Sequence, residues 1–326
     1  MQRMRSHIFY IVNPKAGVGS KNSVLTAIDR FTDSSKYTWQ VAETAYPGHG
    51  AVLATMAVEN GADVVVAVGG DGTVNEIARS LAGTDCVLGI IPAGSGNGLA
   101  RHLQIPLPPQ QAIALINQGA TARLDYGLAN RHPFFCTCGL GFDATISYKF
   151  AQSLRRGAAR YVEKILKEII RYRPETYIID SDDGELTLRA FLLTCANASQ
   201  YGNNAYIAPA ASLSDGLMDV TLIEPFTAIE APQLALRLLD GRLRPGPRIK
   251  MFRSRSLTIL RERKGVIHCD GDPILAGRHI RVCMVRGGLT AIINPAGGAA
   301  QMSLVRTVEE AFNLFLDRTV RDRNQR

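Results

Sequence analysis

The sequence has no hydrophobic run long enough to cross a membrane. A membrane-spanning helix needs about 20 consecutive apolar residues, and no stretch of this 326-residue chain approaches that length. The apolar stretch near the first methionine is also shorter than the hydrophobic segment of a secretory signal. We therefore expect a cytoplasmic protein whose only contact with a membrane is peripheral.

Cysteine spacings typical of metal or redox sites are also missing. The six cysteines lie mostly in apolar, strand-like segments, and the closest pair, Cys136 and Cys138, has C-x-C spacing. Zinc fingers and redox-active dithiols use wider spacings. We expect reduced thiols buried in the core.

Two common nucleotide-binding signatures do not occur. No segment matches the phosphate loop G-x-x-x-x-G-K-[ST] or the dinucleotide fingerprint G-x-G-x-x-G, which disfavours an ordinary dehydrogenase. Aromatic residues are not interleaved with basic ones, so a nucleic-acid partner is not expected. The formal charge of +8 at pH 7 still favours an anionic partner of another kind.

The first third of the sequence alternates strand and helix signals. Apolar, strand-like segments lie at 7–13, 37–44, 62–70 and 87–94. Helical segments follow them at 22–31, 50–60, 73–83 and 108–119. Strands that are apolar on both faces and separated by helices predict a parallel sheet covered by helices. We assign residues 1–122 to an α/β domain.

The pattern changes after residue 122. Strand signals joined by tight turns occupy 123–142, 175–197, 206–212, 216–225, 254–273 and 279–295. This pattern is typical of an antiparallel sheet or sandwich. Helical signals interrupt it at 151–172 and 231–241. We assign 123–298 to a β-sandwich domain and 299–326 to a C-terminal helical tail.

Glycine-rich turns follow three of the predicted parallel strands. They lie at 13–21, 69–73 and 93–98. Because the carboxyl ends of parallel strands share one edge of the sheet, the three turns should converge there. Helix N-termini at that edge attract phosphate, and glycine lets a ligand approach the backbone closely. The sequence therefore predicts a phosphate-binding crevice.

Asp71, in the middle turn G-G-D-G-T, does not suit phosphate binding by itself. A carboxylate among phosphate-binding amides is repelled by the ligand unless a divalent cation or a proton compensates it. The residue therefore suggests metal or proton chemistry. A simple cap of the following helix is the alternative, since Asp is common in that role.

These motifs together resemble a known family. The segments N-P-K-A-G at 13–17, G-G-D-G-T at 69–73 and P-A-G-S-G-N-G-L-A at 92–100 are similar to those of the diacylglycerol kinase catalytic-domain family, which includes sphingosine kinases and bacterial lipid kinases. The segments at 214–219 and 270–272 extend the resemblance to about residue 295. It implies a three-layer α/β domain like that of phosphofructokinase and NAD kinase, followed by an antiparallel β-sandwich.

The resemblance implies transfer of the γ-phosphoryl group of ATP to a lipid hydroxyl. Asp71 would orient magnesium phosphate or the acceptor, and Asp272 would take the acceptor's proton. Asp215, Asp219 and the carbonyl of Leu217 would hold Mg²⁺, although an ordinary Asp-Gly turn explains that segment nearly as well. The positions that would contact ATP are Asn13, Lys15, Gly17, Thr44, Gly70, Gly72, Thr73, Gly94, Ser95 and Asn97.

The sequence departs from the bacterial diacylglycerol kinase pattern at two positions. Gly98 stands where many of those enzymes carry Asp, and Asp272 where they carry Glu. The first departure removes a carboxylate that the resemblance would place in a magnesium bridge between the domains. It also makes the loop more similar in sequence to that of sphingosine kinases. Asp143 resembles the position those kinases use near the lipid head group, where a carboxylate pairs with an amine. The acceptor is therefore left open between a diacylglycerol-like lipid and a sphingoid base.

Two basic segments are candidates for contact with an anionic membrane surface. One is a stripe of five cationic residues on the helix predicted at 151–172, and the other runs from 242 to 255. A solvated helix lying on the sandwich is the alternative for the first. A homodimer stays open, and so do two other functions, a soluble-metabolite kinase similar to NAD kinase and a non-catalytic nucleotide-binding regulator.

Overall fold

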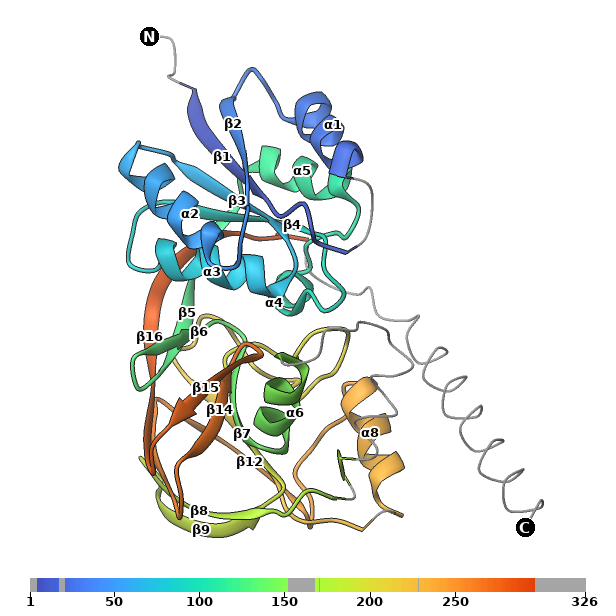
Figure 1. Cartoon of the computed structure of the whole chain (residues 1–326), viewed down its shortest axis with the longest axis vertical. Coiled ribbons are helices and arrows are strands. Elements are labelled where there is room, and N and C mark those ends of the chain that lie inside the picture. Colours follow the sequence, from blue (N-terminus) through green and yellow to red (C-terminus); the bar gives the residue numbers. More distant parts are fainter. Residues whose placement is uncertain (1–4, 18–20, 152–167, 170, 228, 297–326) are drawn as a thin grey trace, which may run out of the picture.

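The computed structural model describes residues 5–17, 21–151, 168–169, 171–227 and 229–296. These residues form an α/β half and a β-sandwich half, one above the other in Figure 1. The predicted fold class, an α/β domain followed by an antiparallel sandwich, is confirmed.

Four parallel strands begin a ten-stranded sheet. Their order is β2 (Tyr37–Glu43), β1 (Ser6–Val12), β3 (Val64–Gly69) and β4 (Val87–Pro92). Every residue of β3 is buried, as expected for a strand covered on both faces. Helices α1 and α5 pack together, as do α2 and α3, on the two sides of these strands (Figure 1). The bounds of these helices are Lys21–Phe31, Pro109–Gln118, His49–Glu59 and Asp71–Leu81, respectively.

One long strand continues this sheet into the second half. Strand β16 (His279–Ile292) runs parallel to β4 and antiparallel to its other partners. Its last residues pack in the core of the α/β half. The same sheet is completed by β5 (Thr121–Ala129), β6 (His132–Phe134), β8 (Glu175–Ser181), β9 (Gly184–Ala190) and β13 (Ser256–Arg261).

The second sheet of the sandwich has six antiparallel strands. Their order is β12 (Ile249–Ser254), β11 (Met218–Ile223), β10 (Leu192–Ala196), β7 (Thr137–Gly141), β14 (Gly265–Cys269) and β15 (Asp272–Ala276). Three cysteines, Cys138, Cys195 and Cys269, are opposite one another on adjacent strands and fully buried. All six cysteines of the chain are free, and only Cys283 is partly exposed. The prediction of reduced core thiols is confirmed.

One local prediction is wrong. Residues 206–212 form no strand beyond one isolated bridge, because the backbone N–H groups of Ile207 and Ala208 both donate to the carbonyl of Ser199. The strand segment predicted to end at residue 142 ends at Gly141. Helix α6 (Phe142–Ala151), which was not predicted, begins directly after it, where Gly141 turns the backbone at φ 95°, a conformation that favours glycine.

The remaining helices complete the comparison with the sequence. Helix α8 (Ala231–Leu239) matches its prediction. Most of the helix predicted at 151–172 and the whole tail at 299–326 lie outside the described residues. Of the helices that the structure describes, none is both long and apolar enough to cross a bilayer.

The two halves are joined near the third glycine-rich turn. Short helix α4 (Gly98–His102) follows that turn and lies against residues 199–204 of the sandwich half. The N–H of Asn203 donates to the carbonyl of Gly96 over 2.9 Å, and the N–H of Ser199 donates to Nδ1 of His102 over 3.0 Å. The sandwich therefore helps to hold a loop of the α/β half in place.

His102 should make this junction sensitive to acid. Burial lowers the pKa of its imidazole from 6.5 to about 4, and protonation at Nδ1 would break the bond from Ser199. The unfolded chain binds a proton below pH 6.5 whereas the folded chain does not until about pH 4, so stability falls as the pH falls through this range. We expect a loss of about 2 kcal/mol at pH 5.

Urea unfolding at pH 7 and pH 5 measures this loss. The His102→Gln variant, which has no titrating ring, should lose about 2 kcal/mol less than the wild type between the two pH values. An equal loss in both proteins would show that His102 does not carry the effect.

Candidate active site

The first two glycine-rich turns meet through Asn13. Its side-chain Nδ2 donates to Oγ1 of Thr73 over 2.9 Å, and its Oδ1 accepts the N–H of Lys15 over 3.0 Å. Lys15 and Gly17 themselves are exposed. The backbone N–H of Thr44 donates to the carbonyl of Val12, which places Thr44 at the same edge of the sheet. Of these four predicted ATP positions, Asn13 contacts the second turn, and the others lie along the same edge of the sheet.

The second and third turns meet through Asp71. Its Oδ1 accepts the N–H of Gly98 over 2.6 Å, and its Oδ2 accepts the N–H of Asn97 over 2.8 Å. The carboxylate forms no cap of its own helix, whose N-cap is Gly70. It instead satisfies the first amides of α4. The alternative of a cap on the helix that follows Asp71 is therefore wrong, because the carboxylate binds amides at the start of α4 and not those of α3.

Glycine is required where these two turns touch. A Cβ on Gly94 would lie 2.5 Å from Cα of Gly70, and a Cβ on Gly96 would lie 2.5 Å from Oδ2 of Asp71. A Cβ on Gly72 would meet no atom within 4 Å. The glycines at 70, 94 and 96 therefore allow the loops to pack, whereas Gly72 borders open space that a ligand can approach.

Asn97 holds the third turn in shape. Its Oδ1 accepts the N–H of Gly94 over 3.0 Å, its Nδ2 donates to the carbonyl of Gly94 over 2.7 Å, and its backbone has φ 53°. Asn tolerates this left-handed conformation better than most residues. Ser95, at the tip of the turn, is exposed.

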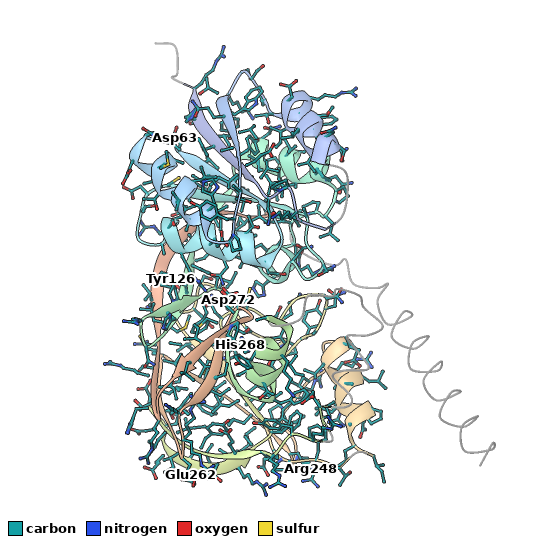
Figure 2. The ribbon with its side chains drawn as sticks, in the orientation of Figure 1. Asp63, Tyr126, Arg248, Glu262, His268 and Asp272 are labelled. Atoms are coloured by element: carbon teal, nitrogen blue, oxygen red, sulfur yellow. The ribbon has the colours of Figure 1, made fainter. Side chains whose placement is uncertain are left out.

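Helix α3 also contacts the sandwich half. Arg79, in its last turn, brings Nη2 within 3.3 Å of Oδ2 of Asp272. Asp71 and Arg79 are two turns apart on α3, which is about 12 Å along the axis. Figure 2 shows Asp272 and His268 at the end of the sandwich that faces the α/β half. The side chain of Asp272 is 55% exposed, so solvent and ligands reach it.

The turn that carries Asp272 is anchored by Asp270. The Asp270 carboxylate accepts the backbone N–H groups of Phe135, Cys136 and Thr137 over 2.7 to 2.9 Å. Burial raises the pKa of Asp270, while these three donors and Arg79 act in the opposite direction. Burial also raises the pKa of Cys136, and the charges of Asp270 and Asp71 add to that shift. The carboxylates of both acidic motifs are therefore close enough to Cys136 to affect its pKa.

Asp143 lies in a buried polar cluster that the sequence did not reveal. Its carboxylate accepts hydrogen bonds from the hydroxyls of Thr194 and Tyr201 and lies beside His268. These partners come from distant segments of the chain, and no spacing in the sequence links them. Glu76 was also missed. It accepts the N–H groups of Gly48 and Gly50 at the start of α2.

The predicted structural metal residues lie together, with a cation already beside them. Oδ1 of Asp219 is 3.3 Å from Nε of Arg253, and Oδ2 of Asp215 is 3.9 Å from Nη1 of the same arginine. Oδ2 of Asp219 is buried without a hydrogen-bond partner in the described part of the chain. Burial raises the pKa of Asp219, with Asp215 adding to the shift and Arg253 opposing it.

Asp215 and Asp219 supply some, but not all, of the oxygen ligands that a hard cation needs. An orphaned carboxylate oxygen beside a second carboxylate suits Mg²⁺ or Ca²⁺. Within the described ranges, however, no cluster of three or more His, Cys, Asp or Glu residues is arranged to hold a metal. A cation here would need backbone oxygen, such as that of Leu217, and water to complete its shell.

The basic segment at 242–255 is largely paired with acidic side chains. Arg242, Arg248, Lys250 and Arg253 each lie within 4 Å of a carboxylate. This pairing favours a structural role over membrane contact. The other basic stripe, formed by Arg156, Arg160, Lys164, Lys167 and Arg171, lies outside the described residues except for Arg171.

Replacing Gly94 by Ala should disturb the site. The added Cβ would press on Gly70, so the two turns must separate, and we expect a loss of about 1–3 kcal/mol in unfolding free energy together with weaker ATP binding. Gly72→Ala is the matched stability control, because its Cβ meets nothing. Urea unfolding checks both variants, and equal stability of Gly94→Ala and the wild type would contradict the close contact.

Comparison with known proteins gives the family. Residues 7–129 match the family model of the diacylglycerol kinase catalytic domain, and residues 137–286 match that of the YegS C-terminal NAD kinase beta sandwich-like domain. A diacylglycerol kinase of Mycobacterium tuberculosis is 31% identical over 234 residues, which cover 68% of this chain and 74% of that protein. A probable lipid kinase YegS-like of Chromohalobacter salexigens is 29% identical over 258 residues, covering 77% and 82%.

Solved structures share the fold. A crystal structure of a diacylglycerol kinase from Bacillus anthracis str. Sterne has a TM-score of 0.71 at 23% identity and covers 89% of this chain and 98% of its own. An NAD kinase from Archaeoglobus fulgidus in complex with ATP has a TM-score of 0.50 at 16% identity, covering 90% and 94%. With both halves matched and the sequence motifs in place, the chain belongs to the diacylglycerol kinase catalytic-domain family of lipid kinases.

Proposed function

We propose that this chain is an ATP-dependent lipid kinase that transfers the γ-phosphoryl group to a lipid hydroxyl. The observation that carries the proposal is the position of Asp71, which joins two glycine-rich turns at the carboxyl edge of a parallel sheet. Residues 1–122 would bind the nucleotide, and residues 123–298 would supply the acceptor side. The tail at 299–326 has no assigned role.

The nucleotide would lie along the edge formed by the three turns. Lys15, Gly17 and Ser95 are exposed there, and Gly72 borders open space at the start of α3. A helix N-terminus and a lysine both attract phosphate. Asn13, Thr44, Gly70, Thr73, Gly94 and Asn97 would shape the edge rather than all contact ATP, since their polar groups are partly engaged with each other.

Phosphoryl transfer needs positioning and charge neutralisation more than covalent chemistry. Asp71 is fixed by two amide donors but each of its oxygens keeps a free lone pair, with which it can orient the phosphates or the acceptor. Magnesium, when bound, supplies neutralisation of the phosphate charge. Asp272 is the carboxylate that would receive the proton from the acceptor hydroxyl.

The surface around Asp272 suits a lipid. Leu275, on the same strand β15, is 71% exposed, and Tyr148 on the neighbouring helix α6 is 45% exposed. Exposed apolar side chains on the strand that carries the candidate base and on the helix packed against that strand favour an acceptor with an acyl chain over a soluble metabolite. An acceptor that resides in a membrane requires the enzyme to work at the membrane surface, so we propose peripheral association.

Two other functions predict different behaviour. A kinase for NAD would phosphorylate NAD and ignore lipids, and a non-catalytic regulator would bind ATP without turnover. Purified protein incubated with labelled ATP and either NAD or a membrane lipid extract separates the three functions by its labelled product. Labelled NAD, or no labelled product at all, would overturn the proposed lipid kinase.

Asp272→Asn should abolish lipid phosphorylation. The amide cannot accept the hydroxyl proton as a carboxylate does, so we expect kcat to fall at least about 100-fold, with the Kd for ATP unchanged. Asp183→Asn, in an exposed turn of the sandwich half, is the matched control. Activity within tenfold of wild type in Asp272→Asn would assign the proton transfer to another group.

Mg²⁺ should stabilise the protein through Asp219. If the orphaned oxygen of Asp219 holds a cation with Asp215 and the carbonyl of Leu217, millimolar Mg²⁺ should raise the melting temperature of the wild type but not of Asp219→Asn. Thermal unfolding without ATP makes this measurement. An equal response in the two proteins would show that the segment 214–219 is an ordinary turn held by Arg253.

A further inference from the structure

Asp143 is the centre of a buried polar cluster between the two sides of the candidate active site. Its side chain is 11% exposed. Oδ2 accepts the hydroxyl of Thr194 over 2.9 Å and that of Tyr201 over 3.0 Å, and Oδ1 accepts the N–H of Ala144 over 2.8 Å. Both carboxylate oxygens are therefore engaged by donors inside the protein.

Tyr201 connects this cluster to the nucleotide side. Its hydroxyl bonds Asp143, while its backbone lies against the third glycine-rich turn. A Cβ on Gly98 would lie 3.2 Å from the carbonyl oxygen of Tyr201. The N–H of Gly98 is one of the two donors to Asp71. A change in the position of the Tyr201 ring would therefore disturb the loop whose amides bind Asp71.

His268 connects the same cluster to the acceptor side. The ring is 2% exposed, and its Nδ1 accepts the N–H of Gly271 over 3.3 Å. With Nδ1 as acceptor, the ring hydrogen is on Nε2. Nε2 lies 3.3 Å from Oδ2 of Asp143 but is not aligned for a hydrogen bond. Gly271 is the middle residue of the turn that presents Asp272.

The close packing of this cluster requires a glycine beside it. A Cβ on Gly139, in β7, would overlap both Oδ2 of Asp143 and Nε2 of His268. The contact between the Asp143 and His268 side chains therefore depends on the pairing of β7 with β14. Both side chains are held in the interior and cannot move apart as two surface residues could.

We propose that Asp143, Tyr201 and His268 are positioning residues that fix the nucleotide loop and the Asp272 turn relative to each other. This inference rests on the lipid kinase function proposed above. It assigns Asp143 to the interior of the protein and not to the lipid head group. The carboxylate then does not discriminate an amine-bearing lipid from a neutral one.

The two arms of the cluster should affect different kinetic constants. Tyr201→Phe removes the hydroxyl that bonds Asp143 and Thr194 but keeps the ring, so we expect the KM for ATP to rise about two- to tenfold with kcat within twofold. His268→Gln removes the acceptor for Gly271, so kcat should fall about 10- to 100-fold with the KM for ATP within twofold. His268→Asn retains an acceptor where Nδ1 lies and should restore most of kcat.

Tyr10→Phe is the matched control. It deletes a buried hydroxyl bond, between Tyr10 and Oγ1 of Thr32 over 2.9 Å, that involves neither the third turn nor the Asp272 turn. We expect lower stability and both kinetic constants within twofold of wild type. Parallel changes of kcat and KM in the Tyr201 and His268 variants, matching their loss of stability, would overturn the positioning roles.

The assignment of Asp143 is tested with two acceptors in mixed micelles, dioleoylglycerol and sphingosine. Asp143→Asn should lower turnover of both by the same factor, whereas a selective loss with sphingosine would place Asp143 at the head group and overturn the inference. If the wild type phosphorylates neither these two lipids nor any lipid of the membrane extract, the proposed function fails, and amide hydrogen exchange then decides the positioning roles. Exchange should quicken at Gly98 in Tyr201→Phe and at Gly271 in His268→Gln, and unchanged exchange at both would overturn them.

Discussion

The geometry of the candidate site depends on one carboxylate and two backbone amides. Asp71 accepts the N–H groups of Asn97 and Gly98, and hydrogen bonds to a charged group contribute about 1.5–3 kcal/mol each. They fix the third turn and the start of α4. Because α4 in turn lies on residues 199–204, these two bonds belong to the contact between the parallel sheet and the sandwich half.

The ion pair between Arg79 and Asp272 contributes much less to that placement. Both side chains are partly exposed, at 33% and 55%, and exposed pairs contribute at most about 1 kcal/mol. A weak pair suits the role of base proposed for Asp272, since the carboxylate can leave Arg79 at little cost to meet an acceptor. The firm anchor of that turn is Asp270, which is buried and accepts three amide donors. Two neighbouring carboxylates thus have different roles because their burial differs.

Hydrophobic pattern and glycine placement were enough to predict the fold class from the sequence. Strand β3 and helix α3 follow from an unbroken apolar run, a glycine turn and a helical period. The strand predicted at 206–212 does not form, because a short apolar run does not show which partners its backbone hydrogen bonds will have. The partners of Asp143 could not be predicted, since Tyr201 is 58 positions away and only tertiary packing brings them together. The glycines on either side of Leu140 were the one local signal of close packing there.

The departure at Gly98 has a physical reason in this chain. A Cβ there would lie 3.2 Å from the carbonyl oxygen of Tyr201 and 3.3 Å from the N–H nitrogen of Gly202, both backbone atoms. An aspartate would therefore require the 199–204 segment to move away, and with it the Tyr201 side chain that bonds Asp143. Glycine at position 98 thus permits the contact between the halves. In the proposed mechanism, the carboxylate at this edge of the sheet is Asp71.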